Sequence, residues 1–146
     1  MSLLLDTNLL VYAAMPAMEE HEAARTWLRA RYEDTAELVG VSWPTLYAFV
    51  RLASSRRIMG DDASPLGGAW RAAMAFVEQE NARLIEAGPV HASIAAELVA
   101  TPGLTSNDVP DVQLAALAIE HGLTLCTHDH GFARFGRLAW TDPLGA

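Results

Sequence analysis

Apolar residues along the chain alternate between short continuous runs and longer stretches with helical spacing. The segments Ser2–Leu5, Leu38–Val41 and Leu123–Cys126 are short and mainly apolar, which is typical of strands buried on both faces of a parallel sheet. Two further strands are predicted near Arg83–Glu86 and Leu138–Trp140. We therefore expect a central, mainly parallel sheet of four to five strands.

The segments between these strands carry apolar residues at helical spacing, bounded by capping and breaking residues. Helices are predicted from Thr7 to before Pro16 and over Glu19–Tyr32, Ser42–Leu52, Ala69–Asn81, Val90–Ala100 and Val109–His121, with a short turn of helix over Gly131–Phe135. In Ala69–Asn81 we expect Trp70, Met74 and Val77 to point inward. The stretch Arg56–Gly68 contains helix breakers and predicts a loop. Strands and helices alternate, so we expect an α/β fold with helices on both faces of the sheet.

Length and composition favour one compact unit spanning residues 1–146. Apolar residues make up 51% of the chain, which is enough for a sizeable core, and no Ser/Gly-rich linker marks a boundary. Cys126 is the only cysteine, so no internal disulfide can form, and its apolar surroundings predict a reduced thiol packed in a strand. No stretch approaches the length needed to span a membrane. We expect a cytoplasmic protein.

The net charge of −8 argues against tight nucleic-acid binding through a global positive field. Clustered carboxylates are nevertheless what a metal site needs, and a bound cation reverses the local charge that a phosphate meets. Composition therefore leaves a metal-dependent nuclease open.

Two carboxylates follow predicted strands. Asp6 ends the first strand, and Asp129 lies three residues beyond the strand Leu123–Cys126. Ligands of open parallel sheets bind at the carboxyl ends of the strands, so both side chains can project into one crevice. Asp111 begins the helix that precedes the second of these strands.

Three motifs in this order resemble the PIN domain. They are Leu4–Asn8, Val109–Ala118 and Leu125–Asp129 with Phe132 following. The segments Phe132–Phe135 and Leu138–Leu144 are similar to the carboxyl-terminal tail of VapC toxins, which belong to VapBC toxin-antitoxin pairs. The likeness extends over nearly the whole chain.

This resemblance implies a three-layer α/β/α fold and a site that binds Mg²⁺ or Mn²⁺ and hydrolyses RNA. Asp6 and Asp111 would be metal ligands, and Asp129 would complete the catalytic cluster directly or through water. Residues that could orient these carboxylates are Thr7, Asn8 and Thr127, while Asp108 stays undecided. The resemblance also implies a VapB-like antitoxin and a homodimer.

Two positions depart from the VapC pattern. A glutamate is usual on the helix after the second strand, and Ala48 stands at that position. A further acid is common two residues after Asp129, where this chain has Gly131. A thinner acidic cluster leaves open whether one metal ion or two would bind. It also leaves open an alternative function, a catalytically weak module that binds protein or RNA.

Simpler structural roles exist for each acid. Asp6 could cap a helix, Asp129 could stabilise a turn, and Asp108 with Asp111 could form a capping box. The pair His128 and His130 lacks a third nitrogen or sulfur ligand, so zinc is disfavoured.

The basic cluster of Arg51, Arg56 and Arg57 could be a solvated face, an RNA contact or an anchor for an acidic partner. A phosphatase with Asp6 as nucleophile ranks lower, because Asn8 stands where a second aspartate is expected.

Overall fold

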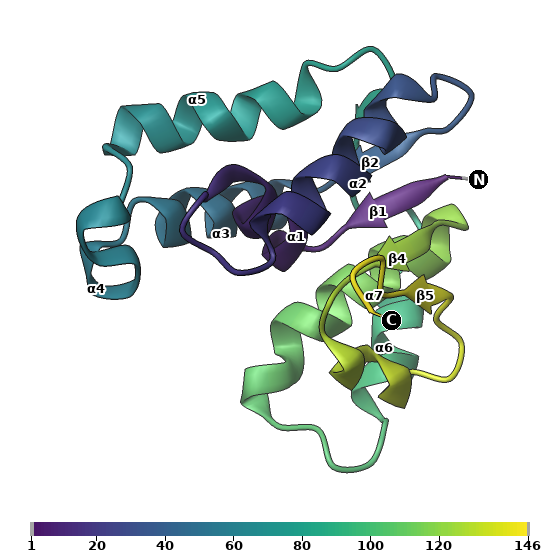
Figure 1. Ribbon diagram of the computed structural model, residues 1–146. Helices are drawn as coiled ribbons and strands as arrows, with labels where there is room; N and C mark the ends of the chain where they lie inside the picture. Colours follow the sequence, from purple (N-terminus) through teal and green to yellow (C-terminus); the bar gives the residue numbers. More distant parts are fainter. Residues whose placement is uncertain (1, 146) are drawn as a thin grey trace.

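Five short parallel strands form the central sheet of the computed structural model, which describes residues 2–145 (Figure 1). The strands are β1 (Leu3–Leu5), β2 (Val39–Val41), β3 (Ala82–Leu84), β4 (Thr124–Cys126) and β5 (Trp140–Thr141). Their order in the sheet is β3-β2-β1-β4-β5, so β1 is central. The expected parallel sheet is confirmed, with β3 and β5 displaced by one or two residues from their predicted bounds.

The described part of the chain contains seven α-helices, six of which cover the two faces of this sheet. They are α1 (Thr7–Ala14), α2 (His21–Glu33), α3 (Trp43–Ala53), α4 (Arg56–Met59), α5 (Leu66–Val77), α6 (His91–Val99) and α7 (Val109–His121). Short 3-10 helices are η1 (Gly60–Asp62), η2 (Ser106–Asp108) and η3 (His130–Arg134). Figure 1 shows α6 and α7 on one side of the sheet and α1, α2, α3 and α5 on the other. The expected three-layer α/β/α fold is confirmed.

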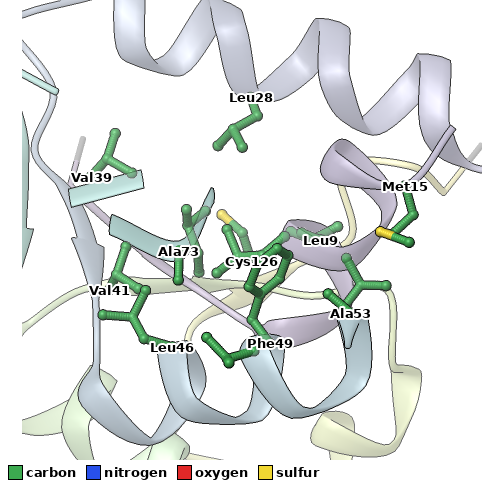
Figure 2. Packing of buried hydrophobic residues seen from close by; sticks show 14 of the residues in the cluster. Leu9, Met15, Leu28, Val39, Val41, Leu46, Phe49, Ala53, Ala73 and Cys126 are labelled. Carbon is green, nitrogen blue, oxygen red and sulfur yellow. The ribbon is translucent and has the colours of Figure 1, made fainter. Parts of the chain in front are cut away.

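Alternating side chains of β1 supply both halves of the core. Leu3 and Leu5 pack with α1, α2, α3 and α5 in one apolar cluster, part of which is seen in Figure 2. Leu4, between them, packs with α6 and α7 in a second cluster. Because successive side chains of a strand point to opposite faces, a run of three leucines fits a strand that is covered on both sides.

The predicted loop at Arg56–Gly68 is wrong in part, because this segment contains α4, η1 and the start of α5. The Ser55 hydroxyl accepts a hydrogen bond from the Ile58 backbone N–H and caps α4. Pro65 stands at the N-cap of α5, which therefore begins at Leu66 and includes two glycines that the prediction treated as breakers. Packing of the helix against the core outweighs the low helical propensity of glycine.

The predicted inward face of α5 is confirmed for Met74 and Val77, which are partly buried and pack against the core, and is wrong for Trp70. Trp70 is 38% exposed, whereas Ala69 and Ala73 are buried. Alanines on the inner face allow α5 to approach the core closely, and the Trp70 ring instead lies 5.8 Å from the ring of exposed Tyr47 on α3. Of the three large apolar residues expected on the inner face, only Trp70 therefore lies on the surface.

Cys126 is a free thiol that is fully buried beside β1, as predicted (Figure 2). Burial raises the pKa of this thiol to about 12, so it is a packing residue and a poor nucleophile. In the range 2–145, none of the helices has both the length and the apolar character required to cross a membrane.

Candidate active site

The carboxyl ends of β1 and β4 lie side by side where the chain connections diverge. From β1 the chain proceeds to β2 and β3 on one side, and it returns to β4 on the other. Leu5 pairs with Cys126 in the sheet, so Asp6 and Thr127 are the next residues of the two strands. This divergence is the usual ligand position of an open parallel sheet, and Asp6 stands there as predicted.

Asp6 is held at this edge by two short hydrogen bonds and a longer one of 3.5 Å from the Asn8 side-chain amide to its Oδ2. Its Oδ1 accepts the backbone N–H of Thr7 at 2.7 Å, which caps α1, and its Oδ2 accepts the Thr127 hydroxyl at 2.7 Å. The capping role is thus confirmed, and the carboxylate also faces the residue that follows β4.

The pKa of Asp6 is raised above its usual value. Burial is the largest cause, and the neighbouring carboxylates of Asp111 and Asp129 raise the pKa further. Hydrogen bonds from Thr127 and Thr7 act in the opposite direction, because they stabilise the ionised form. Asp6 therefore interacts electrostatically with both of the other predicted acids.

The Thr127 hydroxyl connects several groups predicted to surround the site. Besides donating to Asp6, its oxygen accepts the backbone N–H of Asp129 at 2.9 Å and the side-chain amide of Asn8 at 3.3 Å. The Asn8 Oδ1 in turn accepts the backbone N–H of His128 at 3.3 Å. Thr7 contributes its backbone N–H to Asp6.

Asp129 also has the predicted turn role. Its Oδ1 accepts the Gly131 backbone N–H at 2.8 Å and caps η3. No hydrogen bond between residues of the range 2–145 uses its Oδ2. One oxygen of this carboxylate therefore stabilises the turn, and the other can serve a ligand.

The capping box predicted for Asp108 and Asp111 is wrong. The box lies one turn earlier, where Asp108 Oδ2 accepts the Thr105 backbone N–H at 2.8 Å and the Thr105 hydroxyl caps η2. The Asp108 side chain makes no hydrogen bond that caps α7, and α7 directly follows η2. Asp111 is in the first turn of α7 and forms an ion pair with Arg134 instead.

Arg134 at the end of η3 is a site residue that the sequence did not reveal. Its Nη2 lies 2.8 Å from Asp111 Oδ2 and 2.9 Å from Asp108 Oδ1. The sequence signals were its position five residues after Asp129 and its place in Phe132–Phe135, a segment that resembles the VapC tail and was predicted to form a short turn of helix.

A small cavity of about 90 Å³ joins two of the predicted acids. Asp6 and Asp111 line it together with Thr45 and Ala48 of α3. Ala48, where VapC-like chains usually carry a glutamate, thus faces the same space as both proposed ligands. A larger cavity of about 420 Å³ between α2 and α5 shares no lining residue with it.

The oxygen donors of this site match the ligands that Mg²⁺ and Mn²⁺ prefer. Asp111 Oδ1, like Asp129 Oδ2, makes no hydrogen bond within residues 2–145. As the side chains lie, however, no three His, Cys, Asp or Glu residues of that range are grouped closely enough to surround one ion. The donors fit a hard divalent cation by their chemistry, and Asp111 is held by Arg134.

His128 and His130 turn toward the carboxyl-terminal segment rather than toward Asp6. His128 Nδ1 and His130 Nε2 lie 2.9 and 2.7 Å from Oδ2 of Asp142, whose side chain is 7% exposed. The Leu144 backbone N–H donates to Asp142 Oδ1 at 2.9 Å. Through Asp142, the two histidines therefore connect the segment after β5 to the loop that carries Asp129.

The basic cluster lies on the surface beyond α3. Arg51, Arg56 and Arg57 are exposed, and Arg56 is 3.8 Å from the fully exposed Asp61. Such an exposed pair contributes little to stability. The cluster remains available for contact with a partner.

Comparison with known proteins identifies the class to which this fold and site belong. The sequence model of the PIN domain matches residues 3–138, so the chain belongs to the PIN domain family. Among curated relatives, "Ribonuclease VapC33" of Mycobacterium tuberculosis is 39% identical over 146 residues, covering 95% of this chain and 96% of that protein. "Ribonuclease VapC43" of the same organism is 34% identical over 142 residues, covering 97% and 95%. The resemblance to VapC proteins is confirmed over the full length.

Solved structures share the fold at low sequence identity. The VapBC-1 structure from nontypeable Haemophilus influenzae gives a TM-score of 0.71 at 17% identity and covers 99% of this chain and 100% of that chain. The VapBC2 structure from Rickettsia felis, bound to a DNA fragment from its promoter, gives 0.67 at 18% identity and covers 97% and 98%. These likenesses support the three-layer fold.

Proposed function

We propose that this chain is a metal-dependent endoribonuclease and the toxin of a VapBC-type pair. The observation that supports the proposal is that Asp6 and Asp111 line one cavity at the diverging ends of β1 and β4, while Thr127 connects Asp6 to the loop that carries Asp129. The names of the VapC relatives give the substrate class. Hydrolysis of phosphodiester bonds in RNA is the reaction that this acidic site suits best.

In this proposal Asp6 and Asp111 hold Mg²⁺ or Mn²⁺, and Asp129 completes the cluster directly or through water. A bound divalent cation would neutralise charge on the phosphodiester and favour formation of hydroxide from water. Thr127 and Asn8 keep the Asp6 carboxylate in place. Because the protein carries a net charge of −8, the cation is needed to reverse the local charge that an RNA phosphate meets.

Cleavage of RNA by the purified protein tests the activity. We expect turnover with Mg²⁺ or Mn²⁺, its loss with EDTA, and a fall of about 10³-fold or more in Asp6→Asn and Asp111→Asn. Asp61→Asn, which alters a fully exposed carboxylate, is the matched control and should cleave like the wild type. Equal cleavage by Asp6→Asn and the wild type would refute the proposed site.

The partner we propose is a small antitoxin of the VapB type, because similar structures are titled as VapBC complexes. Exposed apolar side chains on α3, α4 and α5 support such an interface: Tyr47, Ile58, Leu66 and Trp70. Co-expression with a VapB-type antitoxin should yield a complex that Ile58→Glu weakens and Val99→Glu, on α6, does not. We also propose a homodimer, which sedimentation of the purified chain will test.

A second candidate function is a catalytically weak module that binds protein or RNA. It is favoured by Ala48, which lines the cavity beside Asp6 and Asp111 without adding a carboxylate. Two results would together support this second function. The wild type would bind RNA equally well with and without metal, and its RNA turnover would be no greater than that of Asp111→Asn.

A further inference from the structure

Arg134 is a cation already present in the acidic site. One nitrogen of its guanidinium group, Nη2, contacts both Asp111 and Asp108, at 2.8 and 2.9 Å. The three side chains are 26 to 29% exposed, so these ion pairs are partly shielded from solvent. Asp111 is one of the two proposed metal ligands, so the same carboxylate has two possible cationic partners.

The local chain holds the guanidinium group in this position. Nη1 donates to the carbonyl oxygen of Gly131, and the guanidinium carbon lies 4.7 Å from the centre of the Phe135 ring. A Cβ atom at position 131 would stand 2.9 Å from Nη1, so the absence of a side chain at Gly131 makes room for the arginine. The missing acid at this position and the presence of the guanidinium group are therefore structurally linked.

The hydrogen bonds of Arg134 are incomplete. Its Nε is buried and has no partner among residues 2–145. A buried donor without a partner carries a free-energy penalty, which lowers the net stability of the arrangement. The contact with Asp111 can therefore be released when a stronger cation competes for the carboxylate.

We propose that Arg134 is the internal competitor of the divalent cation: it occupies Asp111 in the metal-free protein, and metal binding displaces it. This inference rests on the metal site of the proposed function. It accounts for a structure in which Asp6 and Asp111 share a cavity while the acidic side chains do not converge on one point. Metal affinity is then set by the strength of the arginine contact as well as by the number of carboxylates.

Two effects of Arg134 oppose each other. A positive charge beside a divalent ion repels it, and the product of the charges is twice that of an ordinary ion pair. A partner that orients a ligand instead raises metal affinity. Here the guanidinium group binds an oxygen of the proposed ligand itself and is shared with Asp108, so repulsion and competition outweigh orientation.

Titration calorimetry with Mn²⁺ in the absence of RNA separates these effects. We expect Arg134→Gln to bind Mn²⁺ about tenfold more tightly than the wild type, because the competing charge is gone. Arg137→Gln is the matched control, since it makes the same change in net charge but removes an exposed ion pair with Glu97. Its Mn²⁺ affinity should stay within about twofold of the wild type. Unchanged or weaker binding by Arg134→Gln would overturn the inference.

Asp6→Asn distinguishes failure of the inference from failure of the metal site. If the wild type binds Mn²⁺ and Asp6→Asn does not, the site stands and the Arg134 variants decide the inference alone. If neither binds, the proposed metal site itself is refuted. Should Arg134→Gln unfold without metal, Arg134→Met keeps the contact with Phe135, and the same increase in Mn²⁺ affinity is expected.

Discussion

The Thr127 hydroxyl donates a 2.7 Å hydrogen bond to Oδ2 of Asp6, which joins residues 121 positions apart in the sequence. The bond exists because β1 and β4 are parallel neighbours and end at the same level. Thr127 is fully buried, and its oxygen also accepts the Asp129 backbone N–H. One hydroxyl therefore connects the loops that carry two of the three proposed catalytic acids.

Replacing Thr127 by valine tests this connection, because valine keeps the shape and removes the hydroxyl. We expect Thr127→Val to reduce metal affinity and RNA cleavage by about 10- to 100-fold, since Asp6 loses the partner that orients it. The free energy of unfolding should fall by about 1–3 kcal/mol, because buried polar groups lose a partner. Thr127→Ser, which retains the hydroxyl, is the control. Equal cleavage by the valine and serine variants would contradict the orienting role.

Ala48 offers a test by addition of a carboxylate. It lines the cavity shared by Asp6 and Asp111, so a longer acidic side chain on α3 would bring a further oxygen ligand there. We expect Ala48→Glu to bind Mn²⁺ about tenfold more tightly and to melt at a lower temperature in EDTA, because the added charge is then uncompensated. Ala48→Gln is the neutral control. A glutamate variant that binds Mn²⁺ no better than the glutamine variant would contradict this prediction.

Local patterns predicted where Asp6 and Asp129 lie, because the residue after a buried strand has a defined place once the strands are known to be parallel. The bounds of α7 were predicted in full, since Gly122 adopts a left-handed conformation with φ of 65° and ends the helix. Arg134 and Asp142 were missed because their roles depend on contacts between segments far apart in the sequence. No local periodicity encodes such contacts, and the same limit explains the error over Trp70 of α5.

Gly40 in β2 tests the close packing of the central sheet. An added Cβ atom would lie 2.7 Å from Cγ1 of Ile85 and 2.9 Å from the backbone oxygen of Leu3. The Ile85 side chain can move, but the β1 backbone cannot move without disturbing the sheet. We expect Gly40→Ala to lower the free energy of unfolding by about 1–3 kcal/mol, measured by urea denaturation. Gly136→Ala, where the added atom meets open space, should change it by less than about 0.5 kcal/mol.

Asp142 provides a pH-dependent test that is independent of metal binding. Burial alone would raise the pKa of this carboxyl, but hydrogen bonds from His130, His128 and the Leu144 backbone N–H outweigh it and lower the pKa to about 2. An acid whose pKa is lower in the folded than in the unfolded chain stabilises the fold when it is ionised. That stabilisation is present above the unfolded value of about 4 and is lost as the pH falls through about 2.

Asp142→Asn should therefore be less stable than the wild type at neutral pH, by about 1 kcal/mol after allowance for solvent screening. The difference should shrink as the pH falls from about 4 toward 2, because the wild-type carboxylate then becomes protonated. Urea denaturation in EDTA across this range measures it, with Asp61→Asn as the exposed control. The difference in unfolding free energy could instead stay constant between neutral pH and pH 2. The ionised carboxylate would then not stabilise the carboxyl-terminal segment, and the lower stability of Asp142→Asn would come from packing alone.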